Sequence, residues 1–390
     1  MIPITKPVLD ESEARAAAEV ILSGWLSQGA QVAAFEAEFA ALVRAPYACA
    51  VSNCTTALHL ALLAAGVRPG DEVITVSHSF IATANVIRQC GAVPVFVDID
   101  TVTYGLDPEL LAAATTARSR AILCVHQIGM PCDLANILPI ARAHGLPVIE
   151  DAACAIGSEI RLNGAWAPIG APHGDVACFS FHPRKVITTG EGGMLTTRHA
   201  DWDRQFRLLR QHGMSVPDTI RHQANEVVFE DYPISGFNYR LTDMQAAVGR
   251  RQLERLPEIV SRRRALATAY TEMLGDVRGV RTPCEPQWAR SNWQSYCVRL
   301  PEWADQRLVM QAMLDRGVAT RRGVMCSHLE APYAGMRSAP LPQSEWAHRR
   351  GILLPLYPQM TAETQREVVE ALRSALSSPR AAPSPVRDVA

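Results

Sequence analysis

The chain has 390 residues, of which 48% are hydrophobic and 20% are charged. This balance excludes a disordered chain, and the length suffices for two domains with packed cores. The 38 Lys and Arg residues almost balance the 39 Asp and Glu residues, so no basic excess indicates nucleic-acid binding, and no apolar run is long enough to predict a membrane span.

The N-terminus and the cysteines predict a cytoplasmic protein. Residues 1–7 lack the charged and apolar regions of a signal peptide. None of the ten cysteines belongs to a C-x-x-C pair, so we expect no metal site. Several lie in apolar, strand-like runs and are interpreted as small hydrophobic residues in a reducing compartment.

The first part of the chain alternates between helix-like and strand-like segments. Asp10 and Glu13 form a capping-box pattern that predicts the start of a helix. Further helices are predicted over 55–65, 81–90 and 134–144, and strands over 73–76, 93–97, 121–125 and 146–149. Strands separated by helices of this length favour a parallel sheet covered on both faces.

The pattern changes after about residue 240. Helices are predicted over 242–256 and 261–274, with a kink or break at Pro257. A strand over 295–300 and helices over 306–316 and 361–376 follow. We therefore expect a large α/β domain over 1–245, a smaller α+β domain over 246–377, and a disordered, proline-containing tail over 378–390.

The stretch with the most chemical information follows a strand-like run over 175–180. Lys185 comes five residues after Ser180 and precedes a glycine-rich segment, 190–193. A partly desolvated lysine amine forms Schiff bases with aldehydes, and a serine hydroxyl can hold the phosphate of the same ligand. For a lysine taken alone, a solvated loop cation is the commoner interpretation.

Three other positions fit the same ligand. Asp151 follows an apolar strand, where a carboxylate can keep the pyridine nitrogen of pyridoxal phosphate protonated, although a helix-capping role is also open. Thr55 and Thr56 open a helix, as in a phosphate site or an ordinary N-cap. Phe80 follows another strand and fits either a cofactor ring or the core.

These segments together resemble the DegT/DnrJ/EryC1/StrS family of sugar aminotransferases. The resemblance is carried by the Lys185 segment, by 150–153, by 69–74 and by Gly236-Phe237-Asn238-Tyr239-Arg240, and it extends over about 4–376. It implies a fold type I, pyridoxal-phosphate-dependent homodimer with a large, mostly parallel α/β/α domain and a smaller C-terminal α+β domain.

The resemblance also implies a role for each matching residue. Lys185 would hold the cofactor as a Schiff base and then move a proton between cofactor and substrate, with pyridoxamine phosphate as the intermediate form. The other implied contacts are Asp151 with the pyridine nitrogen, Phe80 with the ring, Thr55, Thr56 and Ser180 with the phosphate, Asn238 with the phosphate in the partner subunit, and Arg240 with the phosphate or the substrate.

Two cysteines depart from the family pattern. Cys54 stands where the family usually has Gly, and Cys154 stands where it usually has Gln or His near the ring hydroxyl. A thiol is a poor hydrogen-bond donor, so the polar role of Cys154 is open. In the C-terminal part, His328 matches a family histidine near the substrate, and Arg321 and Arg322 suit a diphosphate or form a solvated basic loop.

The function expected from the resemblance is transfer of an amino group from glutamate or glutamine to a keto-sugar, with a nucleotide-linked keto-deoxysugar as the expected acceptor. A cyclitol or other alicyclic ketone is the alternative acceptor. A sugar dehydratase of the same fold has histidine in place of the anchoring lysine, so Lys185 argues against it. A non-catalytic cofactor-binding regulator is disfavoured by the complete set of Lys185, Asp151 and Ser180.

Overall fold

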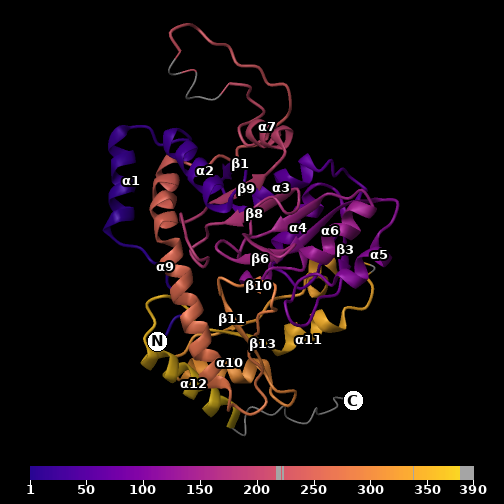
Figure 1. Cartoon of the computed structure of the whole chain (residues 1–390), viewed down its shortest axis with the longest axis vertical. Helices are drawn as coiled ribbons and strands as arrows, with labels where there is room; N and C mark the ends of the chain where they lie inside the picture. The colour runs from indigo at the N-terminus through magenta and orange to yellow at the C-terminus, as the bar shows by residue number, and fades with distance from the viewer. Residues whose placement is uncertain (217–220, 222–223, 337, 378–390) are drawn as a thin grey trace.

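A computed structural model describes residues 1–216, 221, 224–336 and 338–377 (Figure 1). The expected disordered tail, 378–390, lies outside the described residues. Within them, no helix combines the length and the apolar character needed to cross a bilayer.

A seven-stranded sheet forms the centre of the larger part. Its strand order is β1-β9-β8-β5-β4-β2-β3, and β9 runs in the opposite direction to the other six strands. Strands β2, β4, β5 and β8 are almost entirely buried, as expected for a parallel sheet covered on both sides. The strands are β1 (Tyr47–Val51), β2 (Glu72–Val76), β3 (Val93–Val97), β4 (Ser119–Val125), β5 (Val148–Asp151), β8 (Val176–Ser180) and β9 (Gly193–Thr197).

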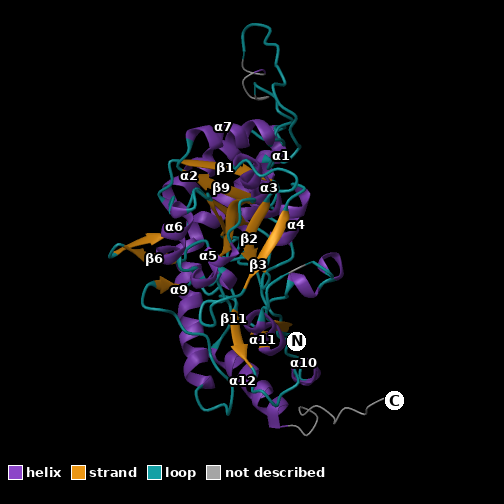
Figure 2. Ribbon diagram, turned by 90° about the vertical axis from the view of Figure 1, so that its right-hand side faces the viewer, coloured by secondary structure: helices purple, strands orange, loops and turns teal. Residues whose placement is uncertain are grey.

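Helices pack on both sides of this sheet, with α3 and α4 on one side and α5 and α6 on the other (Figure 2). The expected α/β/α arrangement is confirmed. The helices of this part are α1 (Glu11–Ser23), α2 (Ala30–Val43), α3 (Cys54–Ala64), α4 (Ala82–Gln89), α5 (Leu111–Ala114), α6 (Leu134–Ala143) and α7 (Ala200–Leu209), and two 3₁₀ turns are η1 (Pro108–Leu110) and η2 (Gln127–Gly129).

The C-terminal part has its own sheet and core. The antiparallel sheet β11-β13-β12 is covered by helices whose apolar faces meet a second cluster of buried residues, including Tyr270, Tyr296 and Leu372. The elements are β11 (Tyr296–Arg299), α10 (Gln306–Asp315), β12 (Arg321–Arg322), η3 (Ser327–Leu329), η4 (Ala331–Tyr333), α11 (Pro342–Arg350), β13 (Gly351–Leu354) and α12 (Ala362–Ser377).

Helix α9 (Asp243–Leu274) runs the length of both parts (Figure 1). Of the predicted kink or break at Pro257, the break is wrong, because one helix continues through that position. Leu253, Leu256 and Val260 pack into the core of the large part, while Leu266 and Tyr270 pack into the C-terminal core. Packing of both halves compensates for the backbone hydrogen bond that proline cannot donate.

Two further features stand out from the main body. A small antiparallel sheet combines β6 (Glu159–Leu162) and β7 (Ala165–Pro168) with β10 (Ala289–Arg290) from beyond α9. The segment between α7 and α9 projects from the end of the molecule away from α12 (Figures 1 and 2). Its described residues include three apolar side chains that are more than half exposed, Val227, Phe229 and Tyr232.

Candidate active site

A cavity of about 1040 Å³ opens at the carboxyl ends of β4, β5 and β8. Both parts of the chain line it, since the walls include the start of α3, the turn after β8, and β12 with the adjoining loop. This edge of a parallel sheet is where open α/β folds bind ligands. Eight predicted site residues line the cavity: Thr55, Thr56, Phe80, Asp151, Ser180, Lys185, Arg321 and Arg322.

Asp151 is the last residue of β5 and is only 6% exposed. Its Oδ2 accepts a hydrogen bond from the Thr83 hydroxyl at 2.8 Å, and its Oδ1 accepts one from the Ala153 amide at 3.2 Å. Burial raises the pKa of Asp151, although these two bonds and the nearby Lys185 oppose the rise. A buried carboxylate of this kind is suited to pair with a cationic ligand group.

Lys185 lies in the turn after β8 and extends into the same cavity. Its Nζ donates a hydrogen bond to Cys154 Sγ at 3.0 Å. Burial acts to lower the pKa of Lys185, but the Cys154 sulfur, followed by Cys54 and Asp151, outweighs burial and raises it. A raised pKa favours the protonated amine, which must lose a proton before it can act as a nucleophile.

The start of α3 has a complete capping box. Asn53 Oδ1 accepts a hydrogen bond from the Thr56 amide at 2.9 Å, and the Thr56 hydroxyl reciprocates by accepting from the Asn53 amide at 3.3 Å. That hydroxyl also donates to Asn53 O at 2.7 Å. Within the described parts of the chain, the Thr55 hydroxyl makes no hydrogen bond, so it is the one available to an anion at this helix N-terminus.

Gly193 allows the close approach between β9 and the start of α3. A Cβ at this position would lie 2.5 Å from the carbonyl carbon and oxygen of Asn53 and 2.8 Å from the Cys54 amide nitrogen. Only glycine fits there without moving the backbone. The last glycine of the predicted lysine segment thus serves to place the α3 N-terminus beside the cavity.

Ser180 and Phe80 lie on different walls. Ser180 ends β8, and its Oγ accepts a long hydrogen bond of 3.4 Å from the His182 amide. Phe80 is 65% exposed although it is a large apolar residue, and it lines the cavity. An uncovered aromatic face in a cavity is suited to a flat ligand ring.

His126, Thr83 and Ser79 are lining residues that sequence reasoning missed. His126 Nδ1 accepts from the Cys132 amide at 3.1 Å, so its Nε2 carries the proton and donates to Glu150 at 2.9 Å. Ser79 Oγ lies 2.8 Å from Thr83 Oγ1, which in turn donates to Asp151. The sequence signal for this part of the cavity was that polar residues follow directly after the strands β2 and β4.

Three arginines bring positive charge to the cavity. Arg321 and Arg322 form β12, at the edge of the C-terminal sheet, and Arg184 precedes the lysine. Arg322 is half exposed and lies 3.5 Å from Glu330. Planar guanidinium groups of this kind can bind phosphate oxygens in pairs.

The remaining predicted site residues, Asn238, Arg240 and His328, do not line the cavity. The Asn238 backbone pairs with Gln211 beside the projecting segment. His328 lies on η3, where its Nδ1 is 2.6 Å from the Ser77 hydroxyl and its amide donates to the same oxygen at 3.0 Å. His328 thus ties the C-terminal part to the end of β2.

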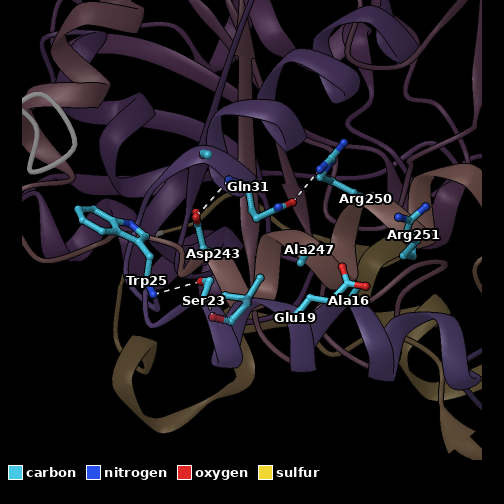
Figure 3. Close-up of a pocket in the computed structure, with 11 residues that line it drawn as sticks. Ala16, Glu19, Ser23, Trp25, Gln31, Asp243, Ala247, Arg250 and Arg251 are labelled. Atoms are coloured by element: carbon cyan, nitrogen blue, oxygen red, sulfur yellow. Dashed lines mark hydrogen bonds between the residues drawn. The ribbon is translucent and has the colours of Figure 1, made fainter. Parts of the chain in front are cut away.

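A smaller cavity of about 470 Å³ lies between α1, α2 and α9 (Figure 3). Asp243 at its edge accepts backbone hydrogen bonds from Gly29, Gln31 and Val32, at 2.7, 3.1 and 2.9 Å. Gln31 in turn accepts a bond of 2.7 Å from Arg250. These contacts fix the start of α2 against α9, which accounts for the polar residues here.

The fold and the large cavity define a pyridoxal-phosphate-dependent aminotransferase of fold type I. The chain belongs to the DegT/DnrJ/EryC1/StrS aminotransferase family, whose model matches residues 7–373. It is 38% identical over 379 residues to the spore coat polysaccharide biosynthesis protein SpsC of Bacillus subtilis, covering 95% of this chain and 96% of that protein.

Two solved structures share the fold over nearly their whole length. DesI, solved with its TDP-sugar product, is 32% identical, with a TM-score of 0.87 and coverage of 97% of this chain and 94% of DesI. Spr1654 of Streptococcus pneumoniae, described as a sugar aminotransferase, is 25% identical. Its PMP form has a TM-score of 0.89, covering 96% of this chain and 99% of Spr1654, and a PLP form has also been solved.

Proposed function

We propose that this enzyme moves an amino group from glutamate or glutamine to the keto group of a nucleotide-linked sugar. The observation that carries the proposal is a single cavity that is lined by Lys185 and Asp151 together with Arg321 and Arg322. Such a cavity suits an aldehyde cofactor at its floor and an anionic substrate toward its mouth.

The residues present fit pyridoxal 5′-phosphate. Asp151 is a buried carboxylate with a raised pKa, which a protonated pyridine nitrogen would compensate. The α3 N-terminus, with the Thr55 hydroxyl, Thr56 and Ser180, would hold the phosphate, and Phe80 would cover the ring. When bound, the cofactor supplies the electron sink that allows an amino group to be exchanged.

The chain's own groups would then position the reactants and move protons. Asp151 keeps a proton on the ring nitrogen, and the Ser79–Thr83 hydroxyl pair fixes the direction of its carboxylate. Lys185 Nζ anchors the cofactor and afterwards carries a proton to and from the reacting carbon. The buried His126–Glu150 pair forms a rigid wall beside them.

The acceptor assignment is supported by charge. Arg321, Arg322 and Arg184 offer forked donors for a diphosphate, and the similar protein DesI has been solved with a TDP-sugar product. We propose that His328 acts indirectly, by holding the loop that follows these arginines. A cyclitol ketone lacks the diphosphate, so it would leave the arginines without a partner.

We further propose that the enzyme is a homodimer whose sites are shared between subunits. Asn238 and Arg240 lie outside their own cavity, beside a segment that exposes Val227 and Phe229. Docking that segment on a second copy would cover these apolar residues and bring Asn238 to the partner's phosphate site. The ten cysteines are free, which supports a cytoplasmic location.

The domain division at residue 245 also stays a proposal. The residues of α9 up to Val260 belong to the core of the large part, and the C-terminal core begins at Leu266. The first half of α9 therefore supports the large part, although it lies beyond the proposed boundary.

The test is spectroscopic. Glutamate or glutamine added to the cofactor-loaded protein should bleach its visible absorbance and leave a pyridoxamine form. That form, screened against keto-sugar nucleotides and keto-cyclitols, should regain the absorbance with a keto-sugar nucleotide. Recovery with keto-cyclitols alone would show that the acceptor is a cyclitol ketone and not a sugar nucleotide. Borohydride labelling of a lysine other than Lys185 would refute the assigned anchor.

A further inference from the structure

Cys154 contacts Lys185 directly, and the backbone of Cys154 is held by hydrogen bonds. Lys185 Nζ donates to Cys154 Sγ at 3.0 Å, and both side chains line the large cavity. The backbone of Cys154 is fixed by Asn292, whose Nδ2 donates to Cys154 O at 2.7 Å and to Ile156 O at 2.8 Å. Asn292 is fully buried, so the backbone that carries the cysteine has little freedom to move.

Close packing strengthens this arrangement. A Cβ on Gly129 would lie 2.1 Å from Asn292 Oδ1 and 3.2 Å from Cys154 O, so the turn after β4 presses directly on the same group. Gly129 also has a φ of 96°, which side chains rarely adopt. The backbone at Cys154 is therefore held by two segments distant from it in the sequence, at Gly129 and at Asn292.

An amine and a thiol this close can exchange one proton. The S–H bond breaks as an N–H bond forms, which yields a thiolate beside an ammonium, and the reverse transfer restores a neutral amine and a thiol. Low local polarity favours a paired ion over two isolated ones. No other reactant is needed, because the proton only moves between sulfur and nitrogen.

We propose that Cys154 is a positioning residue for Lys185, whose sulfur holds Nζ in the cavity and keeps it protonated until the aldehyde cofactor arrives. The raised pKa of Lys185 is consistent with this pairing. The part of the proposal that concerns the cofactor depends on the role of Lys185 in the proposed function. The thiolate–ammonium pair in the cofactor-free protein does not.

The cofactor-free protein gives the first test. Its cysteines are alkylated with iodoacetamide between pH 6 and 9, and the rate at each one is measured by peptide mapping. Cys284 is the only fully exposed cysteine and serves as the internal reference, while the eight others besides Cys154 are buried. A thiolate held by an ammonium should react about 10-fold faster at pH 7 than in Lys185→Ala, with a flatter pH profile.

Lys185→Arg is the matched control. It keeps a positive charge in the cavity, so it should retain much of the fast alkylation that Lys185→Ala loses. Circular dichroism checks that each variant is folded. Equal alkylation rates at Cys154 in the native protein and Lys185→Ala would overturn the proposal.

The second test follows cofactor loading by stopped-flow absorbance. Cys154→Ala should bind pyridoxal phosphate covalently about 10-fold faster at pH 7, because burial without the sulfur favours the neutral amine, and the two rates should converge as the pH is raised. Cys154→Ser, which keeps a hydrogen-bond acceptor but does not ionise, should be as fast as Cys154→Ala.

The outcomes separate the two proposals. Fast alkylation of Cys154 together with unchanged loading in Cys154→Ala would overturn the role of the sulfur in keeping Lys185 protonated. Fast alkylation in a native protein that never bonds the cofactor through Lys185 would leave the thiolate–ammonium pair standing and refute the proposed anchor instead.

Discussion

At the scale of single residues, Asp151 and Lys185 show how burial prepares a site. The carboxylate is withdrawn from water and held by Thr83 and Ala153, yet its pKa is raised. It is therefore less stable as an anion in the cofactor-free protein than in water. A cationic ring nitrogen would relieve this cost, which links cofactor binding to stability.

The variant Asp151→Asn tests this link. An acid whose pKa is higher in the folded than in the unfolded protein costs stability once the pH exceeds its unfolded value of about 3.9. The cofactor-free variant should therefore unfold about 1–2 °C above the cofactor-free native protein at pH 7. This difference should disappear as the pH falls through 4 in a calorimetric series.

Cofactor should reverse the order of stability. Pyridoxal phosphate should raise the melting temperature of the native protein well above that of Asp151→Asn, because the amide cannot pair with a ring cation. A cofactor-free Asp151→Asn protein that melts below the native protein at neutral pH would contradict the argument.

At the scale of elements, Thr55 and Thr56 at the start of α3 have different hydrogen-bond partners, although the sequence pattern does not distinguish them. Both threonines line the cavity, but the Thr56 hydroxyl already bonds to the Asn53 amide and carbonyl, whereas the Thr55 hydroxyl makes no hydrogen bond within the described residues. The capping box thus uses one threonine to close the helix and leaves the other for a ligand.

Matched valine variants separate these roles. Thr56→Val should lower the unfolding free energy of the cofactor-free protein by about 1 kcal/mol, because two hydrogen bonds at the helix start are lost. Thr55→Val should leave that free energy within about 0.5 kcal/mol and weaken binding of the phosphate-bearing cofactor. Denaturant titration and fluorescence titration measure the two effects, and identical behaviour of the variants would contradict the division.

Helix α9 shows that tertiary packing can outweigh a local helix-breaking signal in the sequence. Proline within a helix normally predicts a break, yet Pro257 lies in the interior of a 32-residue helix. Its two halves pack into different cores, so the packing of apolar residues on both sides of the proline outweighs the missing backbone bond.

At the scale of the whole molecule, the projecting segment connects the site to assembly. Phe229 is 87% exposed and Val227 is 82% exposed, on a segment next to Asn238. Apolar side chains this exposed favour a covered position in an oligomer. The proposed homodimer would use them to bring Asn238 into the partner's cavity.

Mixed dimers test that arrangement. Asn238→Ala and Lys185→Ala subunits, each inactive or impaired alone, are combined by co-expression with two different affinity tags. If Asn238 serves the partner's site, the mixed dimer has one doubly altered site and one intact site, and it should show about half of the native activity. Activity no higher than that of the two parent dimers would show that Asn238 acts within its own chain.

The fold class and the family follow from the sequence alone, which also predicted most of the residues that line the large cavity. The positions of Asp151 and Ser180 follow from local patterns, because each ends an apolar strand whose direction and neighbours the alternating elements predict. The capping box at Asp10 and Glu13 was likewise predictable and is confirmed, since all its partners lie within four residues.

Tertiary structure alone decided what depends on segments far apart in the chain. The Thr83 bond to Asp151, the Cys154 contact with Lys185 and the closeness of β12 to the lysine have no local signal. Each arises because the sheet, α4 and the C-terminal part pack in one geometry. Side-chain contacts of this kind are set by the packing of whole elements, which residue patterns do not encode.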